Sequence, residues 1–204
     1  MKQKIQCPCN NIFFIEYQEE INLDINSDLI EQMMDGTFMN YKCSKCGKNH
    51  KPEFPISVIW DSKKIKIEVL PETERGEFYR RKKDPQGFDT IISYPEMAER
   101  VAVLRDDLEP VITETIKSLL FMKANESYPE NDISVWYQHK AMDILEFHIH
   151  GIRKDEVAIS QIPMEMYQNI LADYKKKPRA ERFASLKHRS YLSLQNILRP
   201  EELK

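Results

Sequence analysis

The chain has 204 residues, with 30 Lys and Arg against 33 Asp and Glu, so its formal net charge is −3. This near balance gives no global attraction to nucleic acid or to an anionic membrane. Hydrophobic residues make up 41% of the chain and aromatic residues 10%, which is enough for a folded core and excludes a wholly disordered chain. No apolar run approaches the roughly 18 residues of a membrane-spanning helix.

The first predicted elements are a turn that carries two cysteines and a β-strand. Cys7-Pro8-Cys9 makes the turn, and the β-branched and aromatic residues of segment 12–17 are typical of a strand. The residues before Cys7 lack the apolar stretch of a secretion signal. We therefore expect a cytoplasmic protein that does not associate with membranes.

A short helix is expected over residues 27–36. Ser27 is a good N-cap, and Gly36 is a residue that commonly ends a helix. Strands are expected on both sides of the second cysteine pair, and the last two of them are expected to form a hairpin. These strands are 38–42, 55–60 and 65–69.

The segment 71–87 is predicted to be an exposed loop, because Gly76 and Pro85 flank a basic run. A strand over 88–92 and a short helix over 95–104 are expected to follow.

The clearest helix covers residues 107–123. Pro110 lies in its first turn, and Asp106 or Asp107 is the expected cap. Its apolar residues are spaced to form one face of the helix. They are Leu108, Val111, Ile112, Thr115, Ile116, Leu119 and Leu120.

The last part of the chain alternates strands and helices. A β-hairpin is expected from segments 133–139 and 143–150, and segment 157–162 adds a third strand. Pro163 then opens a helix, and a final short helix is expected near 191–198.

All four cysteines lie within the first 46 residues, in two close pairs. In a reducing cytosol such pairs are more often metal ligands than disulfides. Tetrahedral zinc takes four soft ligands, and each pair supplies two thiolates from one tight turn. The sequence therefore predicts one structural zinc ion on Cys7, Cys9, Cys43 and Cys46. A variant site that uses His50, and a cluster without metal, are the alternatives.

The fold expected from these elements is α+β. An N-terminal zinc-ribbon-like β-lobe with one short inserted helix covers residues 1–72. An α+β lobe with a long helix, a β-hairpin plus third strand and C-terminal helices covers residues 88–204. Residues 73–87 connect the lobes, which either are separate domains or share one core.

The order of motifs in the first lobe resembles that of the CpXC domain family. The shared features are Cys7-Pro8, the helix end at Gly36, the return into Cys43-x-x-Cys46-Gly47, and Pro55-Ile56. Segments 106–108 and 161–167 are similar to later parts of the family pattern, so the resemblance extends over most of the chain. This family of bacterial and archaeal proteins is named for two cysteine motifs and has no established function. Here the first motif is one residue shorter, and Ser44 stands where a proline is expected.

The histidines of the predicted hairpin are a weaker candidate site. His148 and His150 share one strand face with Glu146, and His139 lies across the turn. They are more simply explained as polar residues opposite a packed strand face. The chain has neither a Gly-x-Ser-x-Gly elbow nor a Gly-rich phosphate loop, so the sequence favours a protein that is not an enzyme.

Basic residues gather in two runs that offer a possible nucleic-acid footprint. They are Arg80, Arg81, Lys82 and Lys83, and then Lys175, Lys176, Lys177, Arg179 and Arg182. Phe183 and Tyr191 are close enough in the sequence to stack on bases. A solvated helix end, where lysines oppose the helix dipole, is the favoured explanation of the second run.

The function predicted from the sequence is a zinc-stabilised cytosolic interaction module that recruits protein partners. The alternative is a nucleic-acid-binding protein that uses the zinc lobe and the basic segment. A hydrolase whose residues converge in the folded chain is a third, less favoured reading.

Overall fold

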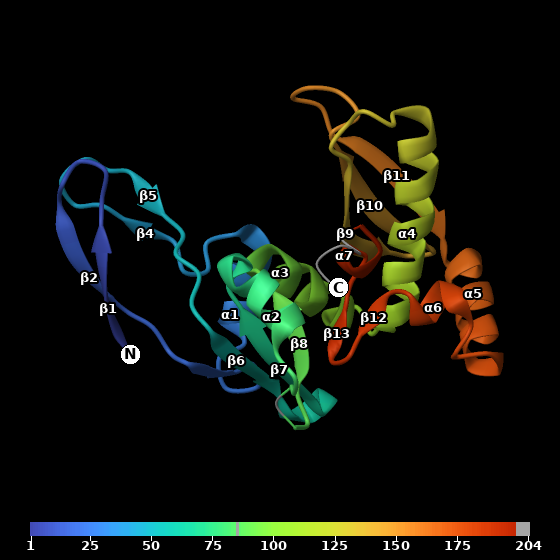
Figure 1. The fold of residues 1–204 in the computed structure, drawn as a ribbon, viewed down its shortest axis with the longest axis horizontal. Coiled ribbons are helices and arrows are strands. Elements are labelled where there is room, and N and C mark those ends of the chain that lie inside the picture. The colour runs from blue at the N-terminus through green and yellow to red at the C-terminus, as the bar shows by residue number, and fades with distance from the viewer. Residues whose placement is uncertain (85, 199–204) are drawn as a thin grey trace. The chain divides into compact units, whose positions relative to one another are not determined.

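The computed structural model describes residues 1–84 and 86–198 (Figure 1). The fold is α+β, as the sequence predicts. The chain divides into two compact units, residues 1–98 and 99–204, and helix α3 (Tyr94–Arg105) contains the division. The predicted division into lobes 1–72 and 88–204, which either are separate domains or share one core, stays a prediction.

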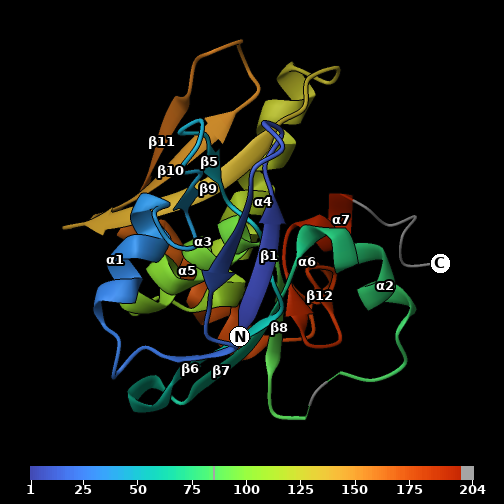
Figure 2. The same cartoon turned by 90° about the vertical axis from the view of Figure 1, so that its left-hand side faces the viewer.

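The first unit begins with two short antiparallel hairpins. One pairs β1 (Lys2–Gln6) with β2 (Ile12–Glu16), and the other pairs β4 (Tyr41–Lys42) with β5 (Asn49–His50). They lie side by side and extend away from the main sheet of this unit (Figures 1 and 2). The sequence did not indicate β1, because its five residues include a single apolar side chain, and pairing with β2 is what makes it a strand.

The main sheet of the first unit has the strand order β3-β6-β7-β8. Its strands are β3 (Glu20–Asn22), β6 (Ile56–Trp60), β7 (Ile65–Leu70) and β8 (Asp89–Ile92). The predicted β6–β7 hairpin is confirmed, with a 3-10 turn at Asp61–Lys63. The pairs β3–β6 and β7–β8 are parallel, so each needs a crossover connection. The crossover between β3 and β6 carries both α1 and the β4–β5 hairpin.

Helix α1 (Asp28–Asp35) ends as the sequence predicts, at Gly36 in the left-handed region with φ +74°. Ser27 occupies the N-cap position, but its side chain makes no capping hydrogen bond to any described residue. The strand expected over 38–42 is wrong in its first half. Phe38 is buried in a turn instead, and extended pairing is confined to β4.

Residues 72–80 are not the exposed loop that the sequence predicts. They form a 3-10 turn (Glu72–Glu74) and helix α2 (Arg75–Arg80), and they bury Phe78 and Tyr79. The guanidinium of Arg75 is also buried, where it donates hydrogen bonds to Glu72 and Glu96. The sequence did not predict this helix, because it is short and contains glycine and several charged residues. Its stability comes from tertiary contacts rather than from helix propensity.

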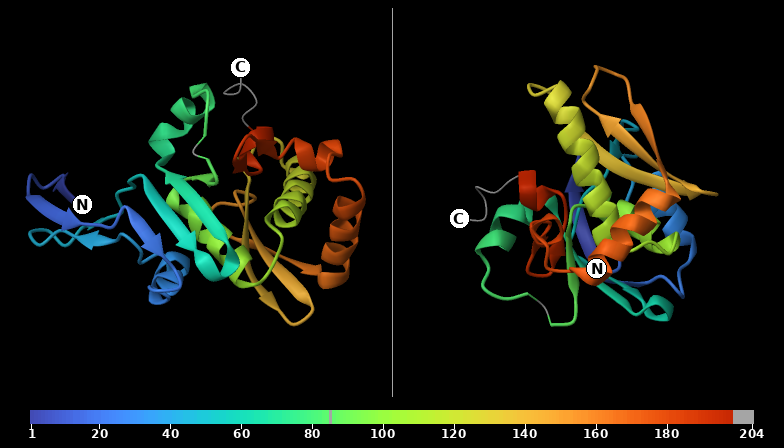
Figure 3. Two further views of the ribbon diagram at one scale, coloured as in Figure 1. Left: turned by 90° about the horizontal axis from the view of Figure 1, so that it is seen from below. Right: turned by 90° about the vertical axis from the view of Figure 1, so that its right-hand side faces the viewer.

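The second unit contains the predicted antiparallel sheet, in the order β11-β10-β9. Helix α4 lies against the sheet (Figure 3). The sheet side chains that are buried alternate along the strands, as expected for one packed face. The elements are α4 (Pro110–Ser127), β9 (Ser134–Ala141), β10 (Ile144–His150), β11 (Ala158–Pro163), α5 (Met164–Lys176), α6 (Glu181–Ala184), β12 (Lys187–His188), β13 (Tyr191–Leu192) and α7 (Gln195–Leu198).

The start of α4 differs from the prediction. Glu109 occupies the cap position, whereas Asp107 adopts a left-handed conformation with φ +55°. Asp106 has another role, since its carboxylate accepts hydrogen bonds from the Tyr137 hydroxyl and the Lys140 backbone N–H of β9. Most of the predicted apolar stripe is buried, but Leu119 is 41% exposed.

A buried ion triad lies in the second unit, and the sequence analysis did not identify it. Lys117 Nζ lies 2.6 Å from Glu99 Oε2 and 2.9 Å from Glu114 Oε1. The other carboxylate oxygens accept the backbone N–H groups of Tyr137 at 2.6 Å and Leu194 at 2.7 Å. Each carboxylate oxygen of the triad and the Lys117 ammonium therefore has a partner, as buried charges require.

Burial and the neighbouring charges shift the pKa values of Glu99 and Lys117 in this triad. Burial raises the pKa of Glu99 to about 7, although the attraction of Lys117 opposes this rise. Burial by itself would lower the pKa of Lys117, but its two carboxylate partners raise it. Lys117 is consequently charged at neutral pH and joins Glu99 of α3 to Glu114 of α4. Through these carboxylates the triad also reaches Tyr137 of β9 and Leu194, the residue before α7.

We expect Lys117→Met to destabilise the protein by about 3–5 kcal/mol, because it leaves two buried carboxylates without their cation. Lys123→Met is the matched control, since Lys123 is exposed on the same helix; its effect should stay within about 0.5 kcal/mol. Urea unfolding followed by circular dichroism measures both. Equal midpoints for the two variants would show that the triad does not stabilise the fold.

Candidate metal centre

The two cysteine pairs lie in the turns of the two short hairpins. In the β1–β2 turn the backbone N–H of Asn10 donates to the Cys7 carbonyl at 2.8 Å, and Asn10 adopts φ +64°. In the β4–β5 turn the N–H of Gly47 donates to the Cys43 carbonyl at 2.9 Å, with φ +74° at Gly47. Each turn therefore needs a residue that tolerates the left-handed region, and the sequence supplies asparagine and glycine.

The four sulfur atoms converge between the hairpins. Cys7 Sγ lies 3.5 Å from Cys46 Sγ, and Cys9 Sγ lies 3.8 Å from Cys43 Sγ. All four sulfur atoms lie within 4.8 Å of one another. A tetrahedral zinc with Zn–S bonds of about 2.3 Å requires S–S distances of about 3.8 Å. The four cysteines, as a group, could therefore hold a metal ion.

Two neighbouring side chains touch the cluster without joining the group of four. Asn11 Nδ2 donates to Cys43 Sγ at 3.5 Å, and His50 Nε2 lies 3.3 Å from Cys7 Sγ. The His50 ring also packs edge-on against Phe13, with centroids 5.5 Å apart. His50 thus contacts a ligand atom from outside, as groups that orient metal ligands do. The sequence analysis did not identify Asn11 as a neighbour of the cluster. Its position directly after the first cysteine turn was the available signal.

The thiols of the cluster titrate unequally without a metal. The backbone N–H of Cys46, followed by the Asn11 amide, stabilises the thiolate of Cys43 and lowers its pKa to about 6. The backbone N–H of Cys9 acts in the same direction on Cys7, but burial and hydrogen bonds with the other thiols outweigh it and raise the pKa of Cys7 to about 12. A cation at the centre would replace the protons that the thiols otherwise keep.

The histidine candidates lie on one strand face, as expected. Burial alternates along β10, with His148 and His150 on the less buried face and Phe147 and Ile149 on the packed face. His148 Nε2 lies 3.2 Å from Glu146 Oε1, and the rings of His148 and His150 have centroids 6.4 Å apart. This arrangement is that of polar residues opposite a packed face, the favoured interpretation from the sequence.

The two basic runs lie in different compact units. Arg80, Lys82 and Lys83 are exposed, whereas Arg81 donates hydrogen bonds to Glu68, Asp84 and Thr90. In the second run the exposed cations are Lys175, Lys176, Lys177, Arg179 and Arg182.

The aromatic part of the nucleic-acid prediction is wrong. Phe183 is 2% exposed and Tyr191 is fully buried, so neither ring is available to stack on a base. Arg182 is engaged as well, with Asp173 at 2.9 Å and the Phe183 ring below its guanidinium. The second run therefore offers charge without stacking platforms.

The fold and the site define a class of protein: an α+β chain whose N-terminal hairpins carry four converging thiols able to hold a metal. The chain belongs to the CpXC family, since the family model described as CpXC protein matches residues 5–117. The matched region includes all four cysteines and most of the first unit.

A curated relative extends the similarity over 95% of the chain. An uncharacterised protein of Treponema pallidum (strain Nichols) is 27% identical over 215 aligned residues, which cover 95% of this chain and 97% of the relative. No solved structure matches the chain. Within ranges 1–84 and 86–198, none of the helices combines the length and the apolar character needed to cross a bilayer.

We expect the apparent affinity for added Zn²⁺ to rise with pH between 6 and 9. Cys7, whose thiol pKa is raised to about 12, must lose its proton to bind metal, whereas Cys43 is largely ionised at neutral pH. Competition with a chromophoric chelator across this range measures the affinity. A flat profile would mean that no thiol proton is displaced and that the cysteines are not the ligands.

Proposed function

We propose that this chain is a zinc-stabilised cytosolic module that recruits a protein partner. The observation that carries the proposal is the convergence of four thiols from two separate hairpins at distances that suit a tetrahedral ion. Four thiolate donors favour soft and borderline metals, and zinc is the commonest of these in structural sites.

A structural rather than a catalytic role follows from the donor set. Catalytic zinc usually keeps three protein ligands and one open position for water. Here Cys7, Cys9, Cys43 and Cys46 supply a full tetrahedral set. The site would therefore hold the ion in a closed shell and act on the fold.

The shorter of the two hairpins would gain stability from such an ion. The β4–β5 hairpin has two residue pairs, and an isolated two-stranded hairpin is marginally stable at best in water. Zinc binding contributes an apparent 10–16 kcal/mol in small zinc peptides. Binding energy on this scale exceeds what the short ladder can provide.

The other hairpin, β1–β2, presents apolar side chains to solvent. Ile12 and Phe14 lie on the same face of β2, two residues apart, and are 48% and 62% exposed. Their cross-strand neighbours on β1 are Gln6 and Lys4. Exposed apolar residues on a rigid support, flanked by polar ones, are typical of surfaces that bind proteins.

Nucleic-acid binding is a second candidate function because of the exposed run Lys175, Lys176, Lys177 and Arg179. Such a run binds phosphates by charge alone, with an affinity that falls steeply with salt.

Cys46→Ser should abolish stoichiometric zinc and unfold the two hairpins, because three thiolates cannot close the shell. Ser44→Ala, an exposed change in the same turn, is the matched control and should keep one zinc per chain. Elemental analysis measures zinc, and limited proteolysis of the first 50 residues measures folding. A Cys46→Ser protein that holds no zinc and still resists protease as well as the control does would contradict a structural metal.

A tagged chain recovered from its native host, with and without nuclease, should retain a defined protein partner in both arms. Phe14→Ser should reduce the recovered partner, because it removes the most exposed ring of the hairpin face. Replacing Lys175, Lys176 and Lys177 by Gln should leave the partner in place. Loss of all partners on nuclease treatment, with recovery of nucleic acid, would favour the second candidate.

A further inference from the structure

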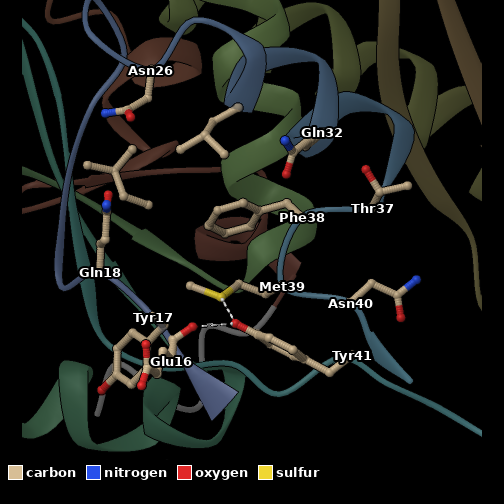
Figure 4. Close-up of a pocket in the computed structure, with 12 residues that line it drawn as sticks. Glu16, Tyr17, Gln18, Asn26, Gln32, Thr37, Phe38, Met39, Asn40 and Tyr41 are labelled. Atoms are coloured by element: carbon tan, nitrogen blue, oxygen red, sulfur yellow. Dashed lines mark hydrogen bonds between the residues drawn. The ribbon is translucent and has the colours of Figure 1, made fainter. Parts of the chain in front are cut away.

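A polar pocket of about 360 Å³ lies in the first unit, at the roots of the two hairpins (Figure 4). Asn26 and Gln32 lie above Phe38 in Figure 4, and Glu16, Tyr17 and Tyr41 lie below it. Buried Ile21 and Phe38 provide an apolar floor. The pocket is unrelated to the cysteine cluster in chemistry, since its lining offers amides, rings and one carboxylate.

The aromatic walls of this pocket are held in place. The Tyr41 hydroxyl donates to the backbone carbonyl of Glu16 at 3.1 Å. The Tyr17 ring stacks on Phe54, with centroids 4.4 Å apart and an interplanar angle of 14°. A pocket with fixed walls loses little conformational entropy when it binds a ligand.

The charge of the pocket is of one sign. Among the described residues that line it, Glu16 carries a charge and no Lys, Arg or His is present. Without cationic donors the pocket does not suit phosphates or carboxylates. The side-chain oxygens of Gln18, Asn26 and Gln32 add further acceptors around Glu16.

The segment that supplies Glu16, Asn26 and Gln32 to the pocket has the same sign. Residues 16–35 contain seven Asp and Glu and no Lys or Arg, and all seven acidic side chains are exposed. The hydroxyls of Ser62 and Thr37 hydrogen-bond to Asp24 and Asp35 and hold the pKa of these carboxyls below the usual value. The segment is therefore anionic at neutral pH, and its charge complements a basic ligand.

We propose that this pocket receives an arginine side chain from a basic segment of a protein partner. An arginine has an aliphatic stem that packs on an apolar floor while its charged head stays at a polar rim. Its planar guanidinium offers five donors to carboxylate and amide oxygens and stacks on aromatic rings. Leu29 extends the floor that Ile21 and Phe38 form, the Tyr17 and Tyr41 rings form the walls, and Glu16 supplies the carboxylate.

The proposal rests on the proposed function, because it supplies the chemistry of the partner that the module recruits. It also separates the two candidate functions, since an anionic segment repels the phosphates of nucleic acid. A basic protein segment is the occupant that the charge and the acceptors of this pocket favour.

The test uses the full chain with zinc added and a fluorescein-labelled peptide of alternating glycine and arginine, followed by fluorescence anisotropy. The same peptide with citrulline in place of arginine keeps the shape and removes the charge, and we expect it to bind at least about tenfold more weakly. Glu16→Gln should weaken arginine-peptide binding about tenfold. Glu77→Gln, an exposed change on α2, should leave it unchanged.

A second variant obstructs the pocket itself. Leu29→Arg places a competing cation in the pocket and should weaken binding at least as much as Glu16→Gln. Equal affinity for the citrulline peptide, or equal effects of Glu16→Gln and Glu77→Gln, would overturn the proposal. So would full recovery of the nuclease-resistant partner by Glu16→Gln, which would leave the proposed function intact. Failure of the wild-type chain to retain any such partner would instead overturn the proposed function.

Discussion

The convergence of four sulfur atoms within 4.8 Å is the constraint that ties together the two hairpins of the first unit. The hairpins that carry them are short, and the strands of one are two residues long. Four thiolates at this separation would repel one another, so the cluster must hold either protons or a cation. Without a metal, the repulsion is relieved by protons, as the raised pKa of Cys7 beside the lowered pKa of Cys43 indicates. A bound metal ion would relieve the same repulsion.

The same constraint reaches the pocket at the roots of the hairpins. Tyr41 lies two residues before Cys43, and its hydroxyl is bonded to the backbone of Glu16 at the end of β2. Any change in the angle between the two hairpins would therefore move Tyr41 relative to Glu16. Because α1 and β4–β5 lie in a single crossover between β3 and β6, the helix that supplies the pocket's floor belongs to the same connection.

The second unit is stabilised by different means. It has a packed sheet face, a long helix and a buried ion triad whose carboxylates also accept backbone N–H groups of Tyr137 and Leu194. A triad of this kind links segments far apart in the chain, with a geometry that admits few alternatives. Its members looked like ordinary surface residues in the sequence, because charge gives no sign of burial when the partner is distant.

Short-range features of this protein follow from the sequence by itself. The sequence predicted the cysteine-bearing turns, the helix end at Gly36, the β6–β7 hairpin and the three strands of the second unit. These predictions succeeded because turn chemistry and residue periodicity are local properties. Only the tertiary structure decided which segments meet. It made a strand of β1 and a helix of residues 75–80, paired β3 in parallel with β6, buried Phe183 and Tyr191, and assembled the pocket around Phe38. Each of these features depends on contacts between residues distant in sequence, and the local amino-acid sequence carries no signal for such contacts.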